Sequence, residues 1–300
     1  MELLRTMLFV PGNRTRMIEK AKGLPADAVV FDLEDAVPLA EKGTARQMTR
    51  AAIDSGDFGR FRVFVRVNAV TTNLLPDDLD AVVCPNLFGI VLPKVEYREE
   101  VDEAHLMLLE REDRMGLPPG QTRILPIIET VRGVLGLSQI AGSNERLVGL
   151  SFGAEDFATD LGVQRSREGT EAHYPRVQIA LYARLTDVTA VDSVFSDVND
   201  DEGLERDTLL VKQLGFRGKF VIHPRQLEVV NRIFTPSEQE VDYARRVVET
   251  YEQAEARGEA SVALDGKMID IPIYQRARGL LSLAEAISRQ QSAVGQSPET

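Results

Sequence analysis

The sequence predicts a (β/α)8 TIM barrel with a C-terminal helical extension. Eight short apolar runs are spaced along the chain, most of them separated by helix-like stretches or by loops long enough for a crossover. Alternation of strand and helix is typical of parallel strands covered by helices, and eight such units suggest a closed barrel. Nearly every run also ends in a polar, charged or glycine-bearing segment. Because barrel enzymes assemble their chemistry at the carboxyl ends of the strands, these segments predict an active site.

The apolar runs are rich in valine, isoleucine, leucine and phenylalanine, and each has the length of a barrel strand. A helix-like segment follows each of them. Strands are expected at residues 7–10, 28–31, 61–67, 89–92, 124–128, 146–150, 191–195 and 219–222. Helices are expected at residues 14–22, 39–53, 76–83, 98–115, 131–140, 174–185, 202–214 and 226–233.

The C-terminal extension begins with a helix signature, in which Thr235 is the expected cap and Pro236 the first helical residue. A charged helix is expected to reach about Arg257, followed by a turn at 258–263 and a lid segment at 264–273. The tail at 290–300 is polar and lacks aromatic residues, so we expect it to be loose. The chain therefore divides into a TIM barrel at 1–234 and a C-terminal helix and lid at 235–300.

Composition narrows the class of protein. A length of 300 residues with 43% hydrophobic content fits one barrel with a modest appendage. The net charge of −12 argues against nucleic acid as a partner, since phosphate backbones attract basic surfaces. Cys84 is the single cysteine, so an internal disulfide is excluded. No run reaches membrane-spanning length, and Glu2 and Arg5 do not suit a signal peptide, so we expect a cytoplasmic protein with no membrane contact.

Two carboxylates, Glu129 and Asp156, follow neighbouring strands and are expected to point into the same mouth of the barrel. Such a pair suits Mg²⁺, or Mn²⁺ in its place, because Mg²⁺ takes few protein oxygens and leaves positions for water and substrate. The alternative is that each carboxylate only caps the helix that follows it. We favour the metal site.

Arg66 interrupts an otherwise apolar strand, where a guanidinium is costly unless it meets an anion. It is a candidate for stabilising an enolate. The alternative is a structural ion pair with Asp32 or Glu34 at the end of the adjacent strand. With Asp35 they form an acidic group that is expected to orient Arg66, hold water bound to the metal, or receive hydrogen bonds from the substrate.

Basic residues cluster near the N-terminus of this acidic chain. Arg14, Arg16 and Lys20 follow Asn13 at an expected helix start, which favours either a phosphate cradle or a solvated basic face. Lys94 ends the fourth apolar run. It is a candidate Schiff-base lysine, but pairing with a carboxylate at the mouth of the barrel or positioning of a ligand fits better beside a metal pair.

In order along the chain, these segments resemble the citrate lyase β-subunit-like family, which includes malyl-CoA and citramalyl-CoA lyases. The matching segments cover most of the chain, and their order makes the resemblance specific. They are Leu8–Asn13, Phe31–Val37, Val65–Asn68, Leu92–Lys94, Ile128–Thr130, Gly153–Phe157 with Asp160–Gly162, and Ile222–Pro224.

The resemblance implies a Mg²⁺-dependent barrel that cleaves a 3-hydroxyacyl-CoA thioester to acetyl-CoA and a 2-oxo acid, glyoxylate or pyruvate. Coenzyme A would be part of the substrate, with its phosphates on the basic N-terminal segment. The resemblance puts the metal ligands at Glu129 and Asp156 and the arginine that contacts enolate oxygens at Arg66. It also implies an acid/base aspartate at Asp270, in a motif delivered from a neighbouring subunit, although by sequence alone Asp270 could be a surface turn residue.

Arg66, Glu34 and Asp270 are therefore the catalytic candidates, with Asn13, Arg14, Arg16, Lys20, Asp32 and Lys94 as binding candidates. The family further implies a homotrimer or a dimer of trimers. A malyl-CoA thioesterase and a citrate lyase β-subunit acting on a carrier-protein thioester are the alternatives. A non-catalytic CoA-binding protein fits the segments least.

Overall fold

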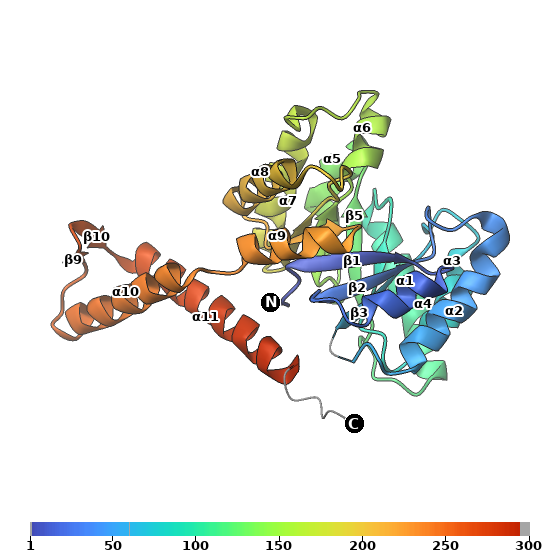
Figure 1. The fold of residues 1–300 in the computed structure, drawn as a ribbon, viewed down its shortest axis with the longest axis horizontal. Coiled ribbons are helices and arrows are strands. Elements are labelled where there is room, and N and C mark those ends of the chain that lie inside the picture. The colour runs from blue at the N-terminus through green and yellow to red at the C-terminus, as the bar shows by residue number, and fades with distance from the viewer. Residues whose placement is uncertain (1, 60, 295–300) are drawn as a thin grey trace. The chain divides into compact units, whose positions relative to one another are not determined.

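The computed structural model describes residues 2–59 and 61–294, and it has a closed barrel of eight parallel strands alternating with helices (Figure 1). This confirms the predicted fold class. Each strand pairs with the next in sequence, and β1 pairs with β8 to close the barrel. The strands are β1 (Thr6–Pro11), β2 (Ala28–Asp32), β3 (Arg62–Arg66), β4 (Gly89–Leu92), β5 (Arg123–Ile128), β6 (Gly149–Phe152), β7 (Thr189–Asp192) and β8 (Gly218–Val221).

Helices cover the outside of the barrel, as parallel strands require. The first half carries α1 (Thr15–Ala21), a short 3₁₀ helix η1 (Leu39–Glu41), α2 (Lys42–Asp54), α3 (Leu75–Val82) and α4 (Arg98–Arg114). The second half carries α5 (Val131–Ile140), α6 (Ala154–Leu161), α7 (Thr170–Leu185), α8 (Asp201–Leu214) and α9 (Pro224–Phe234). Helix α6 was not expected from the sequence. It lies in the loop after β6, where it carries one of the predicted metal ligands.

The barrel interior is filled by side chains from alternate strand positions, because successive residues of a strand point to opposite faces. The buried cluster combines aromatic and aliphatic residues. It contains Leu4, Met7, Ala28, Val30, Phe64, Val91, Leu125, Ile127, Val191 and Phe220. The interior of the barrel is therefore a packed core, and not a pore.

The bounds of two strands differ by two or three residues from those expected. The structure has β6 at Gly149–Phe152, where residues 146–150 were expected, and β7 at Thr189–Asp192, where residues 191–195 were expected. Strand β6 begins at Gly149 rather than at Arg146, whose guanidinium is buried against Glu112 at 2.6 Å. Strand β7 ends at Asp192 rather than at Phe195, and the buried Asp192 carboxylate pairs with Arg176 at 2.9 Å. The expected end of this strand at residue 195 is therefore wrong, and the polar segment that follows β7 starts at Ser193.

Among the described residues, those from Arg232 to Val294 form a separate compact unit, and those before Arg232 form the barrel unit. The second unit contains α10 (Glu238–Ala256), a two-stranded antiparallel sheet of β9 (Val262–Leu264) and β10 (Lys267–Ile269), and α11 (Ile271–Val294). It has its own small apolar core, in which Val247, Tyr251 and Ile269 are buried. The N-cap of α10 is Ser237, not Thr235, because Ser237 forms a capping box with Glu240.

The expected loose tail is corrected in part. Helix α11 continues to Val294, so residues 290–294 are helical, and residues 295–300 lie outside the described part of the chain. Among the described residues, none of the helices combines the length and the apolar character needed to cross a membrane.

Candidate active site

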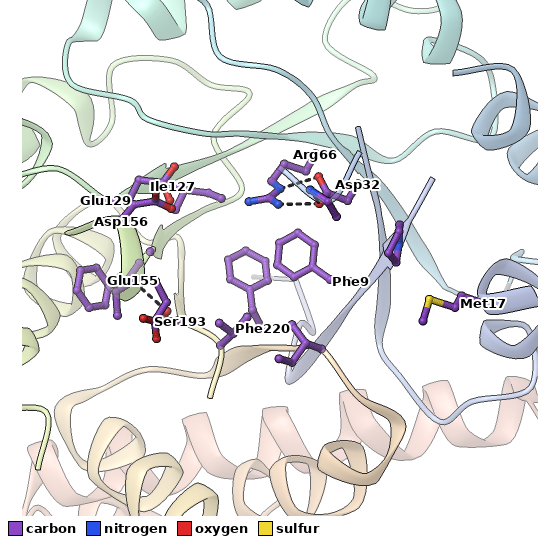
Figure 2. Close-up of a pocket in the computed structure, with 17 residues that line it drawn as sticks. Phe9, Met17, Asp32, Arg66, Ile127, Glu129, Glu155, Asp156, Ser193 and Phe220 are labelled. Atoms are coloured by element: carbon purple, nitrogen blue, oxygen red, sulfur yellow. Dashed lines mark hydrogen bonds and ion pairs between the residues drawn. The ribbon is translucent and has the colours of Figure 1, made fainter. Parts of the chain in front are cut away.

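A cavity of about 350 Å³ lies at the carboxyl ends of the barrel strands. Carboxylates from the loops after β5 and β6, Glu129 and Asp156, line one part of its wall, and Arg66 with Asp32 lines another (Figure 2). Aromatic side chains, chiefly Phe9 and Phe220, form the apolar wall between them. The structure thus brings four of the sequence-predicted site residues to one cavity.

Glu129 directly follows β5 and is only 2% exposed. Its Oε1 accepts a hydrogen bond from the backbone N–H of Lys94 at 2.8 Å. Burial, together with the negative charges of Asp156 and Glu34, raises the pKa of Glu129 to about 8. The carboxylates around Glu129 therefore repel one another, and a divalent cation between Glu129 and Asp156 would relieve this repulsion.

The donor set fits Mg²⁺. In the part of the chain that the structure describes, there is no cluster of three or more histidine, cysteine or acidic side chains arranged to hold a metal. Mg²⁺ is commonly bound by one or two carboxylates and keeps several waters, so the Glu129 and Asp156 pair is sufficient and leaves positions for substrate oxygens.

The absence of a side chain at Gly153 leaves the space that the Glu129 side chain occupies. A Cβ on Gly153 would overlap Glu129 Oε2 and lie 2.5 Å from the Glu129 Cβ. Gly153 is the residue before α6, so the chain passes against Glu129 and then presents Asp156 on the first turn of that helix.

Arg66 is held on two edges and one face. Its Nε and Nη2 donate to the two carboxylate oxygens of Asp32 at 2.8 and 2.6 Å, and its Nη1 lies 3.0 Å from Glu34 Oε2. The Phe9 ring lies 4.9 Å from the guanidinium carbon. Burial alone would lower the pKa of Arg66, but the hydrogen bonds and charge of Asp32 outweigh it and raise the pKa above its ordinary value. The predicted ion pair is present, and the guanidinium still lines the cavity.

Lys94 links two of the carboxylates. Its Nζ donates to Glu34 Oε1 at 2.5 Å, while its backbone N–H binds Glu129. Lys94 has a left-handed backbone with φ of 55°, a strained conformation for a residue other than glycine. Burial lowers its pKa, but the hydrogen bond and charge of Glu34 outweigh this and raise it, so the amine stays protonated. A Schiff-base role needs a neutral amine, so pairing with a carboxylate is the better interpretation.

Glu34 is 5% exposed and lies between the two cations, Arg66 and Lys94. Burial raises its pKa above the ordinary value, against the opposing effect of both cations. A third cation holds the backbone of this loop, since Lys42 Nζ donates to the carbonyls of Leu33 and Glu34 at 2.7 and 2.8 Å. Sequence reasoning missed Lys42, because nothing in a helical charge pattern indicates that one lysine is buried.

The basic N-terminal residues lie outside the cavity wall. Arg14, Arg16 and Lys20 are exposed on and beside α1, and Asn13 donates its side-chain N–H to Glu41. Their role toward phosphate stays a prediction. Asp270 belongs to the second unit, where its Oδ1 accepts the backbone N–H of Ile273 at 3.2 Å at the start of α11.

Comparison with known proteins identifies relatives of this chain. Residues 5–224 match the family model described as HpcH/HpaI aldolase/citrate lyase. The chain is 41% identical over 281 residues to the citrate lyase subunit beta of Escherichia coli K12, covering 94% of this chain and 93% of the relative. It is 36% identical over 286 residues to a (3S)-malyl-CoA thioesterase of Cereibacter sphaeroides strain KD131, covering 95% of each.

A solved structure is also similar to this chain over most of its length. Protein CitE of Mycobacterium tuberculosis, in complex with magnesium, acetoacetate and coenzyme A, superposes with a TM-score of 0.76 at 30% identity and covers 93% of this chain and 97% of that one. These findings confirm the resemblance carried by the motifs. The chain belongs to the HpcH/HpaI aldolase/citrate lyase family and is an enzyme of the oxo-acid lyase type.

Proposed function

We propose that the protein is a Mg²⁺-dependent lyase that cleaves malyl-CoA or citramalyl-CoA to acetyl-CoA and a 2-oxo acid, glyoxylate or pyruvate. The observation that carries the proposal is the placement of Glu129 and Asp156 in the same cavity as Arg66. A lyase of this kind needs one site for the oxygens of the 2-oxo acid and a separate positive group for the thioester enolate. The cavity supplies an acidic part and a cationic part for these two tasks.

Glu129 and Asp156 would hold the metal, which polarises the oxygens of the 2-oxo acid when it is bound. Arg66 donates hydrogen bonds to the enolate oxygen that forms when the carbon–carbon bond breaks. Asp32 and Glu34 fix the guanidinium, so it needs no reorganisation as charge develops. Phe9, Phe220 and Ile127 exclude water from the cavity wall, which strengthens these interactions.

In the cleavage direction the substrate hydroxyl loses its proton as the carbonyl of the 2-oxo acid forms, and Asp270 delivers a proton to the enolate carbon, so one proton leaves and one is added. In the reverse direction Asp270 removes the proton from carbon and the alkoxide that forms takes one up. Its delivery from a neighbouring chain, and therefore a homotrimer or a dimer of trimers, is part of the proposal. Support comes from the resemblance of the segment around Asp270 to the C-terminal motif of the CoA lyases. Coenzyme A is proposed to place its phosphates against Arg14, Arg16 and Lys20, with Asn13 and Lys94 as further binding residues.

The test is to incubate the purified protein and Mg²⁺ with malyl-CoA and with citramalyl-CoA separately and to identify the products by chromatography. Acetyl-CoA with glyoxylate or pyruvate is expected, and the faster substrate identifies the acid. Release of free CoA would instead support a thioesterase, the activity named for the relative from Cereibacter sphaeroides. Absence of turnover with either thioester would favour a carrier-protein thioester as the substrate, the other alternative that the resemblance implies.

A further inference from the structure

Ser193 lines the cavity but was not among the site residues expected from the sequence, because it fell inside the expected strand at 191–195. It directly follows β7, is 2% exposed and lines the cavity. Val191, two residues earlier, belongs to the barrel core, so Ser193 points to the same inner side, while Asp192 between them pairs with Arg176 of α7. The side-chain alternation of a strand therefore continues one residue past the end of β7.

The hydroxyl of Ser193 makes a specific contact with α6. Its Oγ accepts a hydrogen bond from the backbone N–H of Ala154 at 2.9 Å, and Ala154 is the first residue of that helix. The first four N–H groups of a helix have no partner inside the helix. An N-cap side chain binds the second or third of them, so the first, here that of Ala154, needs an acceptor from elsewhere. Here the acceptor is Ser193, which directly follows the adjacent strand β7 (Figure 2).

The N-cap residue of α6 adds no side-chain acceptor of its own. The N-cap of α6 is Gly153, which has no side chain to offer. Serine, threonine or aspartate, the usual caps, would place a Cβ in the space of the Glu129 carboxylate. The fold thus leaves room for Glu129 at position 153, and Ser193, directly after the adjacent strand β7, is the side chain that accepts the first N–H of α6.

We infer that Ser193, directly after β7, is a positioning residue that caps the first N–H of α6 and thereby holds Asp156, on the first turn of α6, in place beside Glu129. The inference rests on the proposed metal site and adds a residue to it. The position of Ser193 is itself fixed, because the preceding Asp192 is buried in ion pairs with Arg176 and with Lys219 of β8.

The test compares Ser193→Ala, Ser193→Thr and Ser151→Ala with the wild-type protein. Ser151 is the matched control, since it is buried on the adjacent β6 and its hydroxyl also makes a 2.8 Å hydrogen bond, to the carbonyl of Pro126, but it does not line the cavity. Mg²⁺ binding is measured by titration calorimetry without substrate. We expect S193A to weaken Mg²⁺ binding about tenfold or more, the usual cost of losing a group that orients a ligand, and S193T and S151A to bind nearly as wild type.

Wild-type affinity in S193A, or an equal loss in S151A, would overturn the inference. Hydrogen exchange of the Ala154 amide in the unmodified protein gives a second readout that needs no variant and no metal. Slow exchange at this first helical residue is expected from the cap, and exchange as fast as in an exposed loop would overturn it. If the wild-type protein binds no Mg²⁺ while Ala154 is protected, the proposed metal site fails and the cap remains.

Discussion

Asp32 accepts two hydrogen bonds from Arg66, from Nε at 2.8 Å and from Nη2 at 2.6 Å, so the carboxylate and the guanidinium lie edge to edge. Two parallel bonds fix the plane of the guanidinium as well as its position. The same Asp32 carboxylate accepts the backbone N–H groups of Glu34 and Ala36 at 2.9 and 3.2 Å. Asp32 therefore ties the arginine to the loop that follows β2.

Asp32→Asn should lower kcat for the preferred CoA thioester about 100-fold, because an amide can accept only one of the two bonds and Arg66 loses its fixed plane. Asp35→Asn is the control, since Asp35 is exposed on the same loop and does not pair with Arg66. Steady-state kinetics of D32N, D35N and the wild-type protein measure the change in kcat. Equal activity in D32N and D35N would mean that Asp32 does not position Arg66 for the reaction.

Gly153→Ala should weaken Mg²⁺ binding about tenfold or more, because the added methyl group occupies the space of the Glu129 carboxylate and displaces it. Calorimetric titration measures the change. Gly43→Ala in α2 is the matched control, since a Cβ there meets no atom within 4 Å, and it should leave binding unchanged. A G153A variant with wild-type affinity would show that Glu129 is not a ligand or can move freely.

Glu112→Gln should lower the free energy of unfolding by about 3–5 kcal/mol, because Arg146 would remain as a buried charge without its partner. Both side chains are fully buried, and Glu112 also accepts the backbone N–H groups of Thr122 and Gly120. Glu110→Gln on the exposed side of α4 should cost less than about 1 kcal/mol. Denaturant unfolding of the two variants measures the difference.

The same pair predicts how stability depends on pH. Burial raises the pKa of Glu112, but hydrogen bonds from Arg146, Thr122 and Gly120 outweigh this and lower it below its ordinary value. A carboxyl with a lowered folded-state pKa stabilises the fold fully above its unfolded pKa of about 4.3, and this contribution is lost as the pH falls further. The difference in unfolding free energy between wild type and E112Q should therefore stay constant from pH 7 down to about pH 4.3 and shrink as the pH falls below that value. A difference that does not shrink there would contradict the assignment.

Asp270→Asn should abolish turnover and leave Mg²⁺ binding intact, because the proposed role of Asp270 is proton transfer and not metal coordination. An asparagine side chain can still accept the N–H of Ile273, so the start of α11 is preserved. Product analysis and calorimetric titration on the same preparation separate the two effects. Unchanged turnover would remove Asp270 from the mechanism.

The barrel and four charged residues of the cavity wall were predictable because they obey local rules. Glu129 directly follows a strand rich in apolar residues, and Arg66 is a charge at the end of another, so both are visible in the sequence pattern. The end of β7 was not predictable in this way. Val194 and Phe195 prolong the apolar run beyond the strand, since Val194 lines the cavity and apolar character reports burial rather than backbone conformation.

Contacts between segments that are distant in the sequence could not be predicted from the sequence either. The acceptor for the Ala154 N–H comes from Ser193, 39 residues later, and the partner of the buried Arg146 is Glu112, 34 residues earlier. Neither contact follows from periodicity or propensity, because each depends on how the strands and helices pack. Position 153 shows the same limit, since its glycine resembles a simple strand-to-helix turn until the Glu129 carboxylate is placed against it.

The register between β1 and β8 has a consequence for synthesis of the chain. Met7 pairs with Phe220 and Leu8 with Val221, so the last seam of the barrel joins the two ends of the unit. At translation rates of about 5–20 residues per second, β8 is made roughly 10 to 40 s after β1. During that interval β1 has an unpaired edge, which is a template for association with other chains. A nascent chain of this protein is therefore most exposed to misassembly before its final strand leaves the ribosome.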